Sequence, residues 1–395
     1  TGVTLASAIW MIYCVLELFN PQSISPKGWT MAIRSLAFYF FLIVVLTQLT
    51  MARYKYLKAM LAVWSVLTLV AVLKALVQKY VGFNAAENYW LFVEGGSVTH
   101  IIYTGVRYFS VYSDAANFGA GMGLAMVVFS ISALYYENRW MKIYLLAVAA
   151  AACYGMLISG TRSALAVPFA GYAVFVVLSR NFRMVIAGVI LIIGAFIFLN
   201  FTSIGQGNSI IRRARSAFNT QDASFQVRLE NQDRIRALMK DKPFGAGLGH
   251  GGGKAKVFAP NAPLSQIPTD SWFVMIWVET GIVGLLLHIG ILLYILGRGA
   301  FLVAFRLRNN QLRGLTAALI SGISGVVVMS YGNEVLGQIP TGAIIYMSMA
   351  FIFLSPRFDK ELEEAELEKH AVPGKNLLAL NPRSRTALPS TLAKE

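Results

Sequence analysis

Apolar runs long enough to cross a lipid bilayer dominate the pattern of hydrophobic and polar positions along the chain. A transmembrane helix needs about 20 predominantly apolar residues, and ten runs approach or reach that length. They cover Leu5–Phe19, Trp29–Leu49, Leu57–Val77, Ala115–Tyr135, Trp140–Ser159, Ser163–Leu178, Val185–Phe201, Trp272–Leu296, Leu312–Met329 and Ile339–Leu354. The pattern predicts an all-α fold, a polytopic transmembrane bundle of about ten helices in this chain.

Basic residues in the short connections indicate how this bundle is oriented, because Lys and Arg concentrate on the cytoplasmic side. When the crossings are counted, the basic clusters, from Arg53–Lys58 to Arg357–Lys360, fall on one face. The opposite face carries the connection Gln78–Asp114 and a long loop, Phe201–Asp270. The predicted divisions are residues 1–200 for the first seven helices, 201–270 for a large periplasmic loop, 271–355 for the last three helices and 356–395 for a partly disordered cytoplasmic tail.

Composition agrees with a membrane protein. The chain has 56% hydrophobic and 13% charged residues and a mean hydropathy of +0.60, whereas soluble domains have about 25% charged residues. Cys14 and Cys153 lie in apolar runs, which leaves no disulfide framework and no Cys-based metal site. The chain starts at Thr1 without a basic leader, so we expect it to begin inside a longer protein. We attribute the net charge of +15 to membrane anchoring and anionic lipids, and we expect no nucleic-acid partner.

The long loop is basic on the side where basic residues are usually sparse. It carries six Arg and four Lys against five Asp and Glu. A helix is predicted over Phe225–Lys242, ended by Pro243. The basic residues of the loop that are candidates for substrate binding fall into two groups. Arg228, Arg234 and Arg236 lie on this helix, and Arg212, Arg213 and Arg215 lie nearer the membrane. They form either a solvated surface or a site for an anionic lipid headgroup.

Arg162 stands in the turn Ser159-Gly-Thr-Arg-Ser163, at the outer end of an apolar run. Its guanidinium either reaches toward lipid headgroups or holds a phosphate, which guanidinium binds in a bidentate manner. A glycine-rich stretch follows the loop helix, with Gly247, Gly249 and Gly252 at GxGxxG spacing. No predicted strand precedes it and Ala255 follows Lys254, so a nucleotide loop is not supported and the glycines indicate a tight chain path.

Three titratable residues near the end of the loop are further candidates. His250 and Asp270 could each accept a proton from a hydroxyl nucleophile, although His250 could also be an exposed loop residue and Asp270 a helix N-cap. Glu279 lies inside the following apolar run, where an ionisable side chain is either functional or paired with a partner, and we count it among the substrate-binding candidates. The chain contains neither HExxH nor GxSxG, so metal-dependent and serine-hydrolase chemistry have no support.

Three segments together resemble the O-antigen ligase and O-antigen polymerase family. They are Ser159–Ala164, the stretch Arg228–Gly249 with its KPFGAGLG sequence, and Asp270–Gly284 with its E-x-G-x-x-G pattern. The order also fits: an arginine at a helix mouth, a long outer loop with an arginine-led helix, then a helix with the E-x-G motif. The resemblance covers residues 159–284 and implies a GT-C-like membrane glycosyltransferase with about twelve helices in the full protein.

The activity implied by the resemblance is inverting, metal-independent and cofactor-free glycosyl transfer at the periplasmic face of the bacterial inner membrane. The donor would be a glycan on undecaprenyl diphosphate, and the acceptor a hydroxyl of the lipid A core or of a second lipid-linked glycan. Arg162 and Arg228 match the arginine positions of the family and would bind the diphosphate. Family ligases place a histidine where this chain reads Pro268-Thr-Asp-Ser271. Either Asp270 replaces this histidine, or His250 reaches the acceptor, or the reaction needs no strong base.

Two other functions remain possible from the sequence. A polymerase of the same family would extend lipid-linked chains rather than transfer them to the lipid A core. A transporter or flippase of lipid-linked sugars would also need cations for the diphosphate, but along a path through both leaflets. A structural scaffold would leave the arginines of the loop and Glu279 unexplained.

Overall fold

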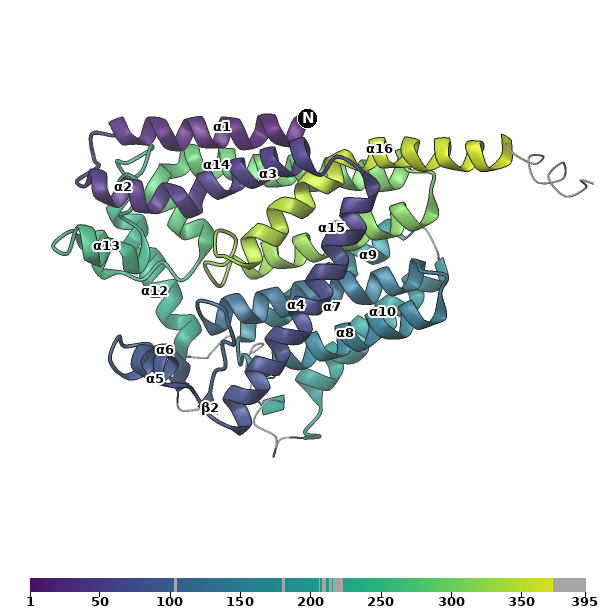
Figure 1. Cartoon of the computed structure of the whole chain (residues 1–395). Coiled ribbons are helices and arrows are strands. Elements are labelled where there is room, and N and C mark those ends of the chain that lie inside the picture. The colour runs from purple at the N-terminus through teal and green to yellow at the C-terminus, as the bar shows by residue number, and fades with distance from the viewer. Residues whose placement is uncertain are drawn as a thin grey trace, which may run out of the picture.

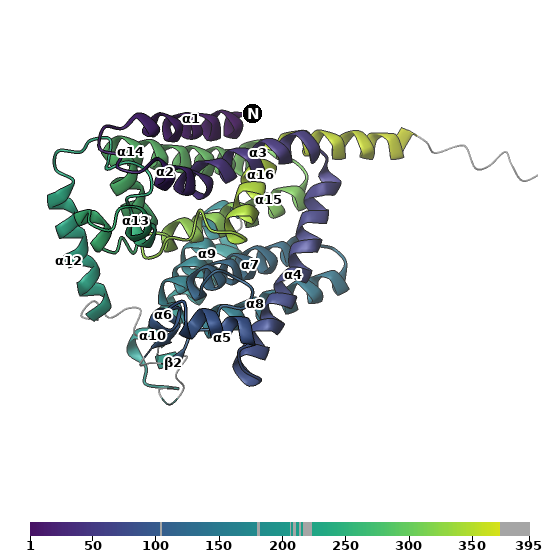
Figure 2. The same ribbon diagram turned by 60° about the vertical axis from the view of Figure 1, so that its left-hand side comes forward.

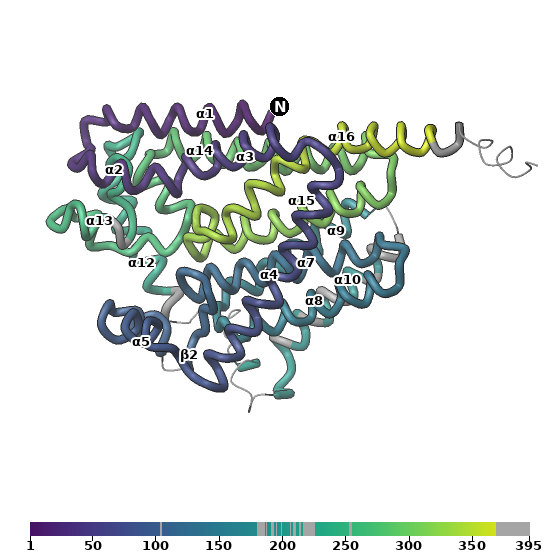
Figure 3. Tube along the Cα trace, viewed as in Figure 1, coloured from purple at the N-terminus to yellow at the C-terminus, as the bar shows by residue number. Residues whose placement is uncertain are grey.

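The computed structural model describes residues 1–102, 105–179, 182–205, 207, 211–212, 215 and 223–371 (Figure 3). The predicted site residue Arg213 and the end of the tail from residue 372 lie outside these residues. Within them, eight helical segments are long and apolar enough to cross a membrane. The all-α polytopic membrane fold predicted from the sequence is confirmed.

Each of the ten apolar runs lies in one helix or in consecutive helices, except for Ser159, Ile339 and Pro340 at the ends of two runs. The membrane-spanning candidates are α1 (Gly2–Leu16) with a turn to Phe19, α2 (Pro26–Ile33) continuing into α3 (Tyr39–Thr50), α4 (Tyr54–Tyr80), α7 (Ala115–Tyr135), α8 (Arg139–Ile158), α14 (Trp272–Phe301), α15 (Asn310–Met329) and α16 (Thr341–Ala371). Two further apolar helices are α9 (Ala166–Leu178) and α10 (Phe182–Phe201). A 3₁₀ turn, Arg162–Leu165, precedes α9.

The centre of the bundle is built by α7, α9 and α15, with small residues at their contacts. A β-carbon on Gly325 of α15 would overlap the carbonyl oxygen of Val167 in α9, and one on Gly171 of α9 would lie 3.0 Å from the carbonyl oxygen of Ser321 in α15. Small residues let helices approach closely where the lipid gives no hydrophobic drive for association. These contacts fix the turn before α9, which carries Arg162.

The shorter elements gather at one end of the bundle. They are α5 (Ala85–Phe92), α6 (Ser97–His100), a hairpin of β1 (Ile101–Ile102) and β2 (Gly105–Val106), α12 (Ala223–Leu238), and α13 (Gly252–Phe258). They lie on the left in Figure 1, opposite the end where α16 runs out, and the rotated view in Figure 2 agrees. We call this the loop end.

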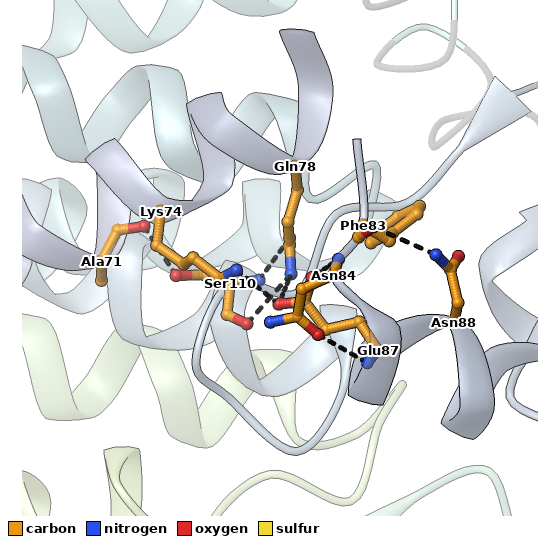
Figure 4. A network of polar contacts seen from close by, with 8 residues as sticks. All are labelled: Ala71, Lys74, Gln78, Phe83, Asn84, Glu87, Asn88 and Ser110. Atoms are coloured by element: carbon orange, nitrogen blue, oxygen red, sulfur yellow. Dashed lines mark hydrogen bonds and ion pairs between the residues drawn. The ribbon is translucent and has the colours of Figure 1, made fainter. Parts of the chain in front are cut away.

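A polar network ties the connection between α4 and α7 to the bundle (Figure 4). The Gln78 side chain at the end of α4 accepts from the backbone N–H of Ser110 at 2.8 Å and donates to its carbonyl oxygen at 3.1 Å. The Ser110 hydroxyl donates to the carbonyl oxygen of Ala71 at 2.6 Å. Lys74 forms an ion pair with Glu87 at 2.8 Å. Four side-chain contacts thus hold a connection of little regular structure.

The helix predicted in the long loop is present as α12, which is shorter than the prediction at its C-terminal end. Ile235 and the following Met239 are buried against Val274 and Val278 of α14. Packing on α14 fixes how α12 leaves the membrane surface. Arg228, nearer the start of α12, therefore has a defined place relative to the bundle.

The glycine-rich stretch after α12 docks into a break in α14. Gly281 of the E-x-G motif has φ 69° and ψ −172°, outside helical values. The backbone N–H of Ala246 donates to the carbonyl oxygen of Val278 at 2.8 Å, and the N–H of Val283 donates to that of Pro243 at 3.3 Å. At the break, backbone groups of α14 thus form hydrogen bonds with the loop in place of the hydrogen bonds that they would form within a continuous helix.

Both sides of this contact depend on glycine. A β-carbon on Gly281 would overlap the carbonyl group of Pro243, and one on Gly245 would lie 2.6 Å from the backbone of Glu279. Both glycines also have positive φ angles, which side chains disfavour. The PFGAG sequence of the loop and the E-x-G sequence of α14 therefore pack directly against each other. The tight chain path predicted for the glycine-rich stretch is observed.

Candidate functional site

A polar cavity of about 410 Å³ lies at the loop end. Its walls come from the connection before α7, from Arg228 of α12, from the start of α13, from the segment just before α14 and from the link between α15 and α16. These pieces lie far apart in the sequence. The cavity exists only because the loops from both halves of the chain meet over the bundle.

Three arginines come together at this cavity. Arg107 and Arg228 line it. Arg162 lies beside its wall, because Thr161 accepts a hydrogen bond from Arg107 at 2.9 Å and Ser163 accepts one from Asn333, another lining residue. The pKa of Arg107 is lowered, mainly by burial and further by the positive charges of Arg162 and Arg228, while Asp114 opposes the shift. Arginine nevertheless remains protonated in proteins.

Two of the three arginines are the pair that the sequence resemblance predicts. A β-carbon on Gly332 would lie 3.4 Å from Ser163 Cβ and 3.6 Å from Arg228 Nη1. Gly332, in the short link after α15, therefore lies between the turn that carries Arg162 and the Arg228 side chain of α12. The structure thus brings Arg162 and Arg228 to one place from elements more than sixty residues apart.

Carboxylates line the same cavity. Asp114 caps α7: its Oδ1 accepts from the N–H groups of Ala116 and Asn117 at 2.7 and 2.9 Å. Glu334 accepts a hydrogen bond from the hydroxyl of Thr269. Asp270 is exposed and adopts φ 50°, a conformation that is uncommon outside glycine. Of these three carboxylates, only Asp270 was singled out as a candidate from the sequence.

Asp270 does not cap the helix that follows it, so the N-cap interpretation is wrong. Ser271 holds that position, and its hydroxyl accepts from the N–H of Val274 at 3.5 Å. The carboxylate of Asp270 instead belongs to the wall of the cavity. Residues held in sparsely populated backbone conformations often cluster at functional sites.

His250 is buried away from the residues that line the cavity. Its Nε2 accepts from the backbone N–H of Ile24 at 3.2 Å, and its Nδ1 is 3.0 Å from the carbonyl oxygen of Gly247. With Nε2 accepting, the ring proton is on Nδ1, so the ring is neutral and both nitrogens bind backbone. Burial lowers its pKa. The predicted alternative of an exposed loop histidine is wrong, since only 3% of the side chain is exposed.

Glu279 is also buried and does not line the cavity. Its Oε1 accepts from the N–H of Gly251 at 3.3 Å, across the contact between the glycine-rich stretch and α14. The carboxylate therefore ties the loop to the broken helix. Its predicted role in binding substrate stays a prediction.

The other basic residues of the loop lie elsewhere. Arg234 pairs with Glu230 at 2.6 Å and Arg236 with Asp233 at 3.0 Å, and both arginine side chains are more than half exposed. Arg215 donates to the carbonyl oxygen of Ile204 at 2.7 Å, beyond the end of α10. Arg212 is exposed. The structure brings none of these four to the cavity.

Sequence reasoning missed Arg107, Asp114, His100 and Glu334 in the cavity wall. His100 is a neutral packing residue: its Nε2 accepts from the N–H of Ala115 at 3.0 Å, and burial lowers its pKa. Arg107 did carry a signal, because it is a basic residue on the side of the membrane where short connections rarely have one. Among the described residues, no three His, Cys, Asp or Glu side chains are grouped as metal ligands would be.

Fold and cavity together define a multi-pass membrane protein with a polar site, lined by arginines and carboxylates, at one end of its bundle. Residues 145–289 match the family described as O-antigen ligase. A curated protein of Salmonella muenchen, described as an O-antigen polymerase, is 29% identical over 197 residues, which are 47% of this chain and 45% of that protein. The chain thus spans less than half the length of this relative. These matches confirm the resemblance seen in the sequence: this part of the chain is similar to O-antigen ligases and polymerases.

The matched segment does not contain the whole cavity. It includes Arg162, Arg228 and Asp270, whereas Arg107 and Glu334 lie outside it. The site therefore combines a part that the family match covers with walls contributed by the connections before α7 and after α15.

Proposed function

We propose that the chain is an inverting, metal-independent membrane glycosyltransferase that moves a glycan from undecaprenyl diphosphate to a hydroxyl acceptor at the periplasmic face of the inner membrane. The observation that carries this proposal is the meeting of Arg162 and Arg228 at a polar cavity at the loop end. Arginines hold phosphate oxygens in bidentate pairs. A site with two arginines at the end of a membrane-spanning bundle fits the diphosphate of a lipid-linked sugar.

The proposed reaction needs no energy source besides the donor. The acceptor oxygen attacks the anomeric carbon, and the bond from that carbon to the diphosphate oxygen breaks. The electron pair leaves with the diphosphate, where Arg162 and Arg228 stabilise the charge as it develops. The proton of the acceptor hydroxyl passes to a base, and Asp270 is the candidate that lines the cavity. His250 is not proposed for this role, because backbone groups occupy both ring nitrogens.

The proposed acceptor is a sugar of the lipid A core, which would make the chain a ligase. The description of the matched family supports this choice. A second lipid-linked glycan is the alternative, because the relative from Salmonella muenchen is described as a polymerase. A flippase is the less favoured function, since the arginines gather at one end of the bundle.

The test is transfer by the purified full chain in proteoliposomes containing EDTA, with undecaprenyl diphosphate-linked glycan and with or without lipid A core. Product on the core indicates a ligase, and longer lipid-linked chains in its absence indicate a polymerase. Arg162→Ala and Arg228→Ala should each lower the rate about a hundredfold to a thousandfold. The matched control is Arg236→Ala, because Arg236 is exposed and paired with Asp233. Protein-dependent passage of the lipid-linked glycan across the bilayer without transfer would overturn the proposal.

A further inference from the structure

The structure assigns a third arginine to the anion site: we infer that Arg107 binds the diphosphate of the lipid-linked donor together with Arg162 and Arg228. This inference rests on the proposed function and names a donor-binding residue outside the segment that the family match covers. Arg107 lies in the connection before α7, just after β2.

Two hydrogen bonds fix the orientation of the Arg107 guanidinium. Nη1 donates to the carbonyl oxygen of Thr99 at 3.0 Å, and Nη2 donates to the hydroxyl of Thr161 at 2.9 Å. Thr161 is itself held, since its hydroxyl donates to the carbonyl oxygen of Ala115 at 2.9 Å. Because Thr161 directly precedes Arg162, the Arg107 side chain is coupled to the turn that carries Arg162.

The third nitrogen of the Arg107 guanidinium, Nε, has no acceptor in the part of the chain that the structure describes. This nitrogen is buried and makes no hydrogen bond there. A buried unpaired donor on a charged group is costly. The side chain lines the cavity, so an anion bound there would satisfy the donor that the protein leaves open.

The charges around Arg107 also favour an anion. Burial is the main cause of the lowered pKa of Arg107, and the positive charges of Arg162 and Arg228 lower it further. Asp114 opposes the shift, but its Oδ1 already serves two N–H groups of α7. Asp270 and Glu334 also line the cavity, whereas a diphosphate carries its negative charges on neighbouring oxygens and could contact the three guanidinium groups together.

Hydrogen bonds to α4 hold the backbone near Arg107 in place. Ser110, three residues later, is held by Gln78 and by the carbonyl oxygen of Ala71, as Figure 4 shows. Ser110 has φ 57°, so its hydrogen bonds hold a strained turn. Groups that act on a reacting centre need this kind of support. A guanidinium placed this way is ready for a ligand before the ligand arrives.

A purely structural role is the competing explanation, in which Arg107 only joins Thr99 to Thr161. The two roles differ in what a substitution changes. Loss of a structural link lowers the melting temperature and leaves the affinity of the folded protein for diphosphate unchanged. Loss of an anion ligand weakens diphosphate binding even where the protein stays folded.

The experiment measures binding of inorganic diphosphate, inorganic phosphate and undecaprenyl diphosphate to the full chain in lipid nanodiscs, with the melting temperature recorded for each variant. Arg107→Gln should raise the Kd for both diphosphates roughly tenfold to a hundredfold. The matched control Arg236→Gln should change it by less than about twofold, because Arg236 is an exposed, ion-paired residue. Tighter binding of diphosphate than of monophosphate by the wild type is also expected.

A second variant covers the case in which Arg107→Gln does not fold. Arg107→Lys keeps the charge but loses the planar set of donors, so it should still weaken diphosphate binding at least about threefold. The inference is overturned if either folded Arg107 variant binds diphosphate like the wild type while Arg162→Gln does not. Binding that depends on Arg107 in a protein that transfers no glycan would refute the proposed function and support the anion site.

Discussion

Two segments cover the loop end, and they use their charged residues differently. The long loop between α10 and α14 is rich in Arg and Lys, yet Arg234 and Arg236 form exposed ion pairs and Arg215 donates to backbone beyond α10. The connection between α4 and α7 is nearly neutral in composition. It nevertheless places a guanidinium and a carboxylate, those of Arg107 and Asp114, in the wall of the cavity.

The comparison shows that a segment rich in charged residues does not necessarily bring them to the cavity. Contacts that hold the backbone of a segment in place also matter. The connection is held to α4 by buried hydrogen bonds and an ion pair. In the long loop, the parts with comparable support are the start of α14 and the glycine-rich stretch docked at Gly281. Arg228 lines the cavity from α12, which is held in place by its packing on α14.

The largest effect is expected from disrupting the contact that anchors the long loop, in which the glycine-rich stretch packs against the break in α14. Gly281→Ala places a methyl group against the carbonyl of Pro243 in a residue with positive φ. We expect a loss of about 3 kcal/mol or more in the free energy of unfolding, or failure to fold. Gly290→Ala is the matched control on the same helix, because apart from the adjoining backbone of that helix nothing lies within 4 Å of a β-carbon at Gly290. Equal melting temperatures for the two variants would refute the described anchor.

A large effect on activity is expected from the one arginine of α12 that reaches the cavity. Arg228→Ala should reduce glycan transfer about a hundredfold or more, with little change in melting temperature. Arg234→Ala, two turns further along the helix, should leave transfer within about twofold, since exposed ion pairs contribute about 0–1 kcal/mol. Transfer rates for the two variants at equal protein amounts provide the check. Comparable losses would mean that the whole basic surface acts, rather than the cavity.

A smaller effect is expected from loosening the connection. Gln78→Ala removes both hydrogen bonds to the backbone of Ser110 and leaves buried groups unpaired. This should cost about 1–3 kcal/mol of stability and speed amide hydrogen exchange around Ser110. Asn88→Ala is the control, because the Asn88 side chain makes an exposed hydrogen bond to the carbonyl oxygen of Phe83. Unchanged exchange in the Gln78 variant would contradict the role of this network.

The smallest effect concerns pH. Burial lowers the pKa of His100 in the connection and of His250 in the glycine-rich stretch. The unfolded chain therefore binds protons that the folded chain does not, so stability should fall as the pH drops below about 6.5, the usual pKa of histidine. Melting temperatures between pH 8 and pH 5 test this, and His100→Gln should flatten the curve. A melting temperature that rises on acidification would contradict the assignment of neutral rings.

Much of the fold could be predicted from the sequence because the bilayer imposes a length on each helix. The run Ala115–Tyr135 coincides with α7, and the other nine runs lie in observed helices apart from at most two residues at one end. The break at Gly281 could not be predicted, since the helical pattern of α14 continues through it. Only the approach of Pro243 from another segment explains why glycine is required there.

The site could be predicted only in part. Arg162 and Arg228 were found through the resemblance, and the structure brings them together. Arg107 and Glu334 were missed because each is a single charged residue in a short, unpatterned segment, and only tertiary contacts bring them to the cavity. His250 was favoured by its residue type, whereas its hydrogen bonds to backbone could not be read from the sequence.

The most direct test of the central claim is an electron cryo-microscopy structure of the full chain with undecaprenyl diphosphate in a lipid nanodisc. We predict density for the diphosphate in the cavity, within hydrogen-bond distance of Arg162 and Arg228, with the lipid chain leaving toward the membrane. A diphosphate bound elsewhere on the bundle, with the cavity unchanged from the unliganded protein, would contradict the account.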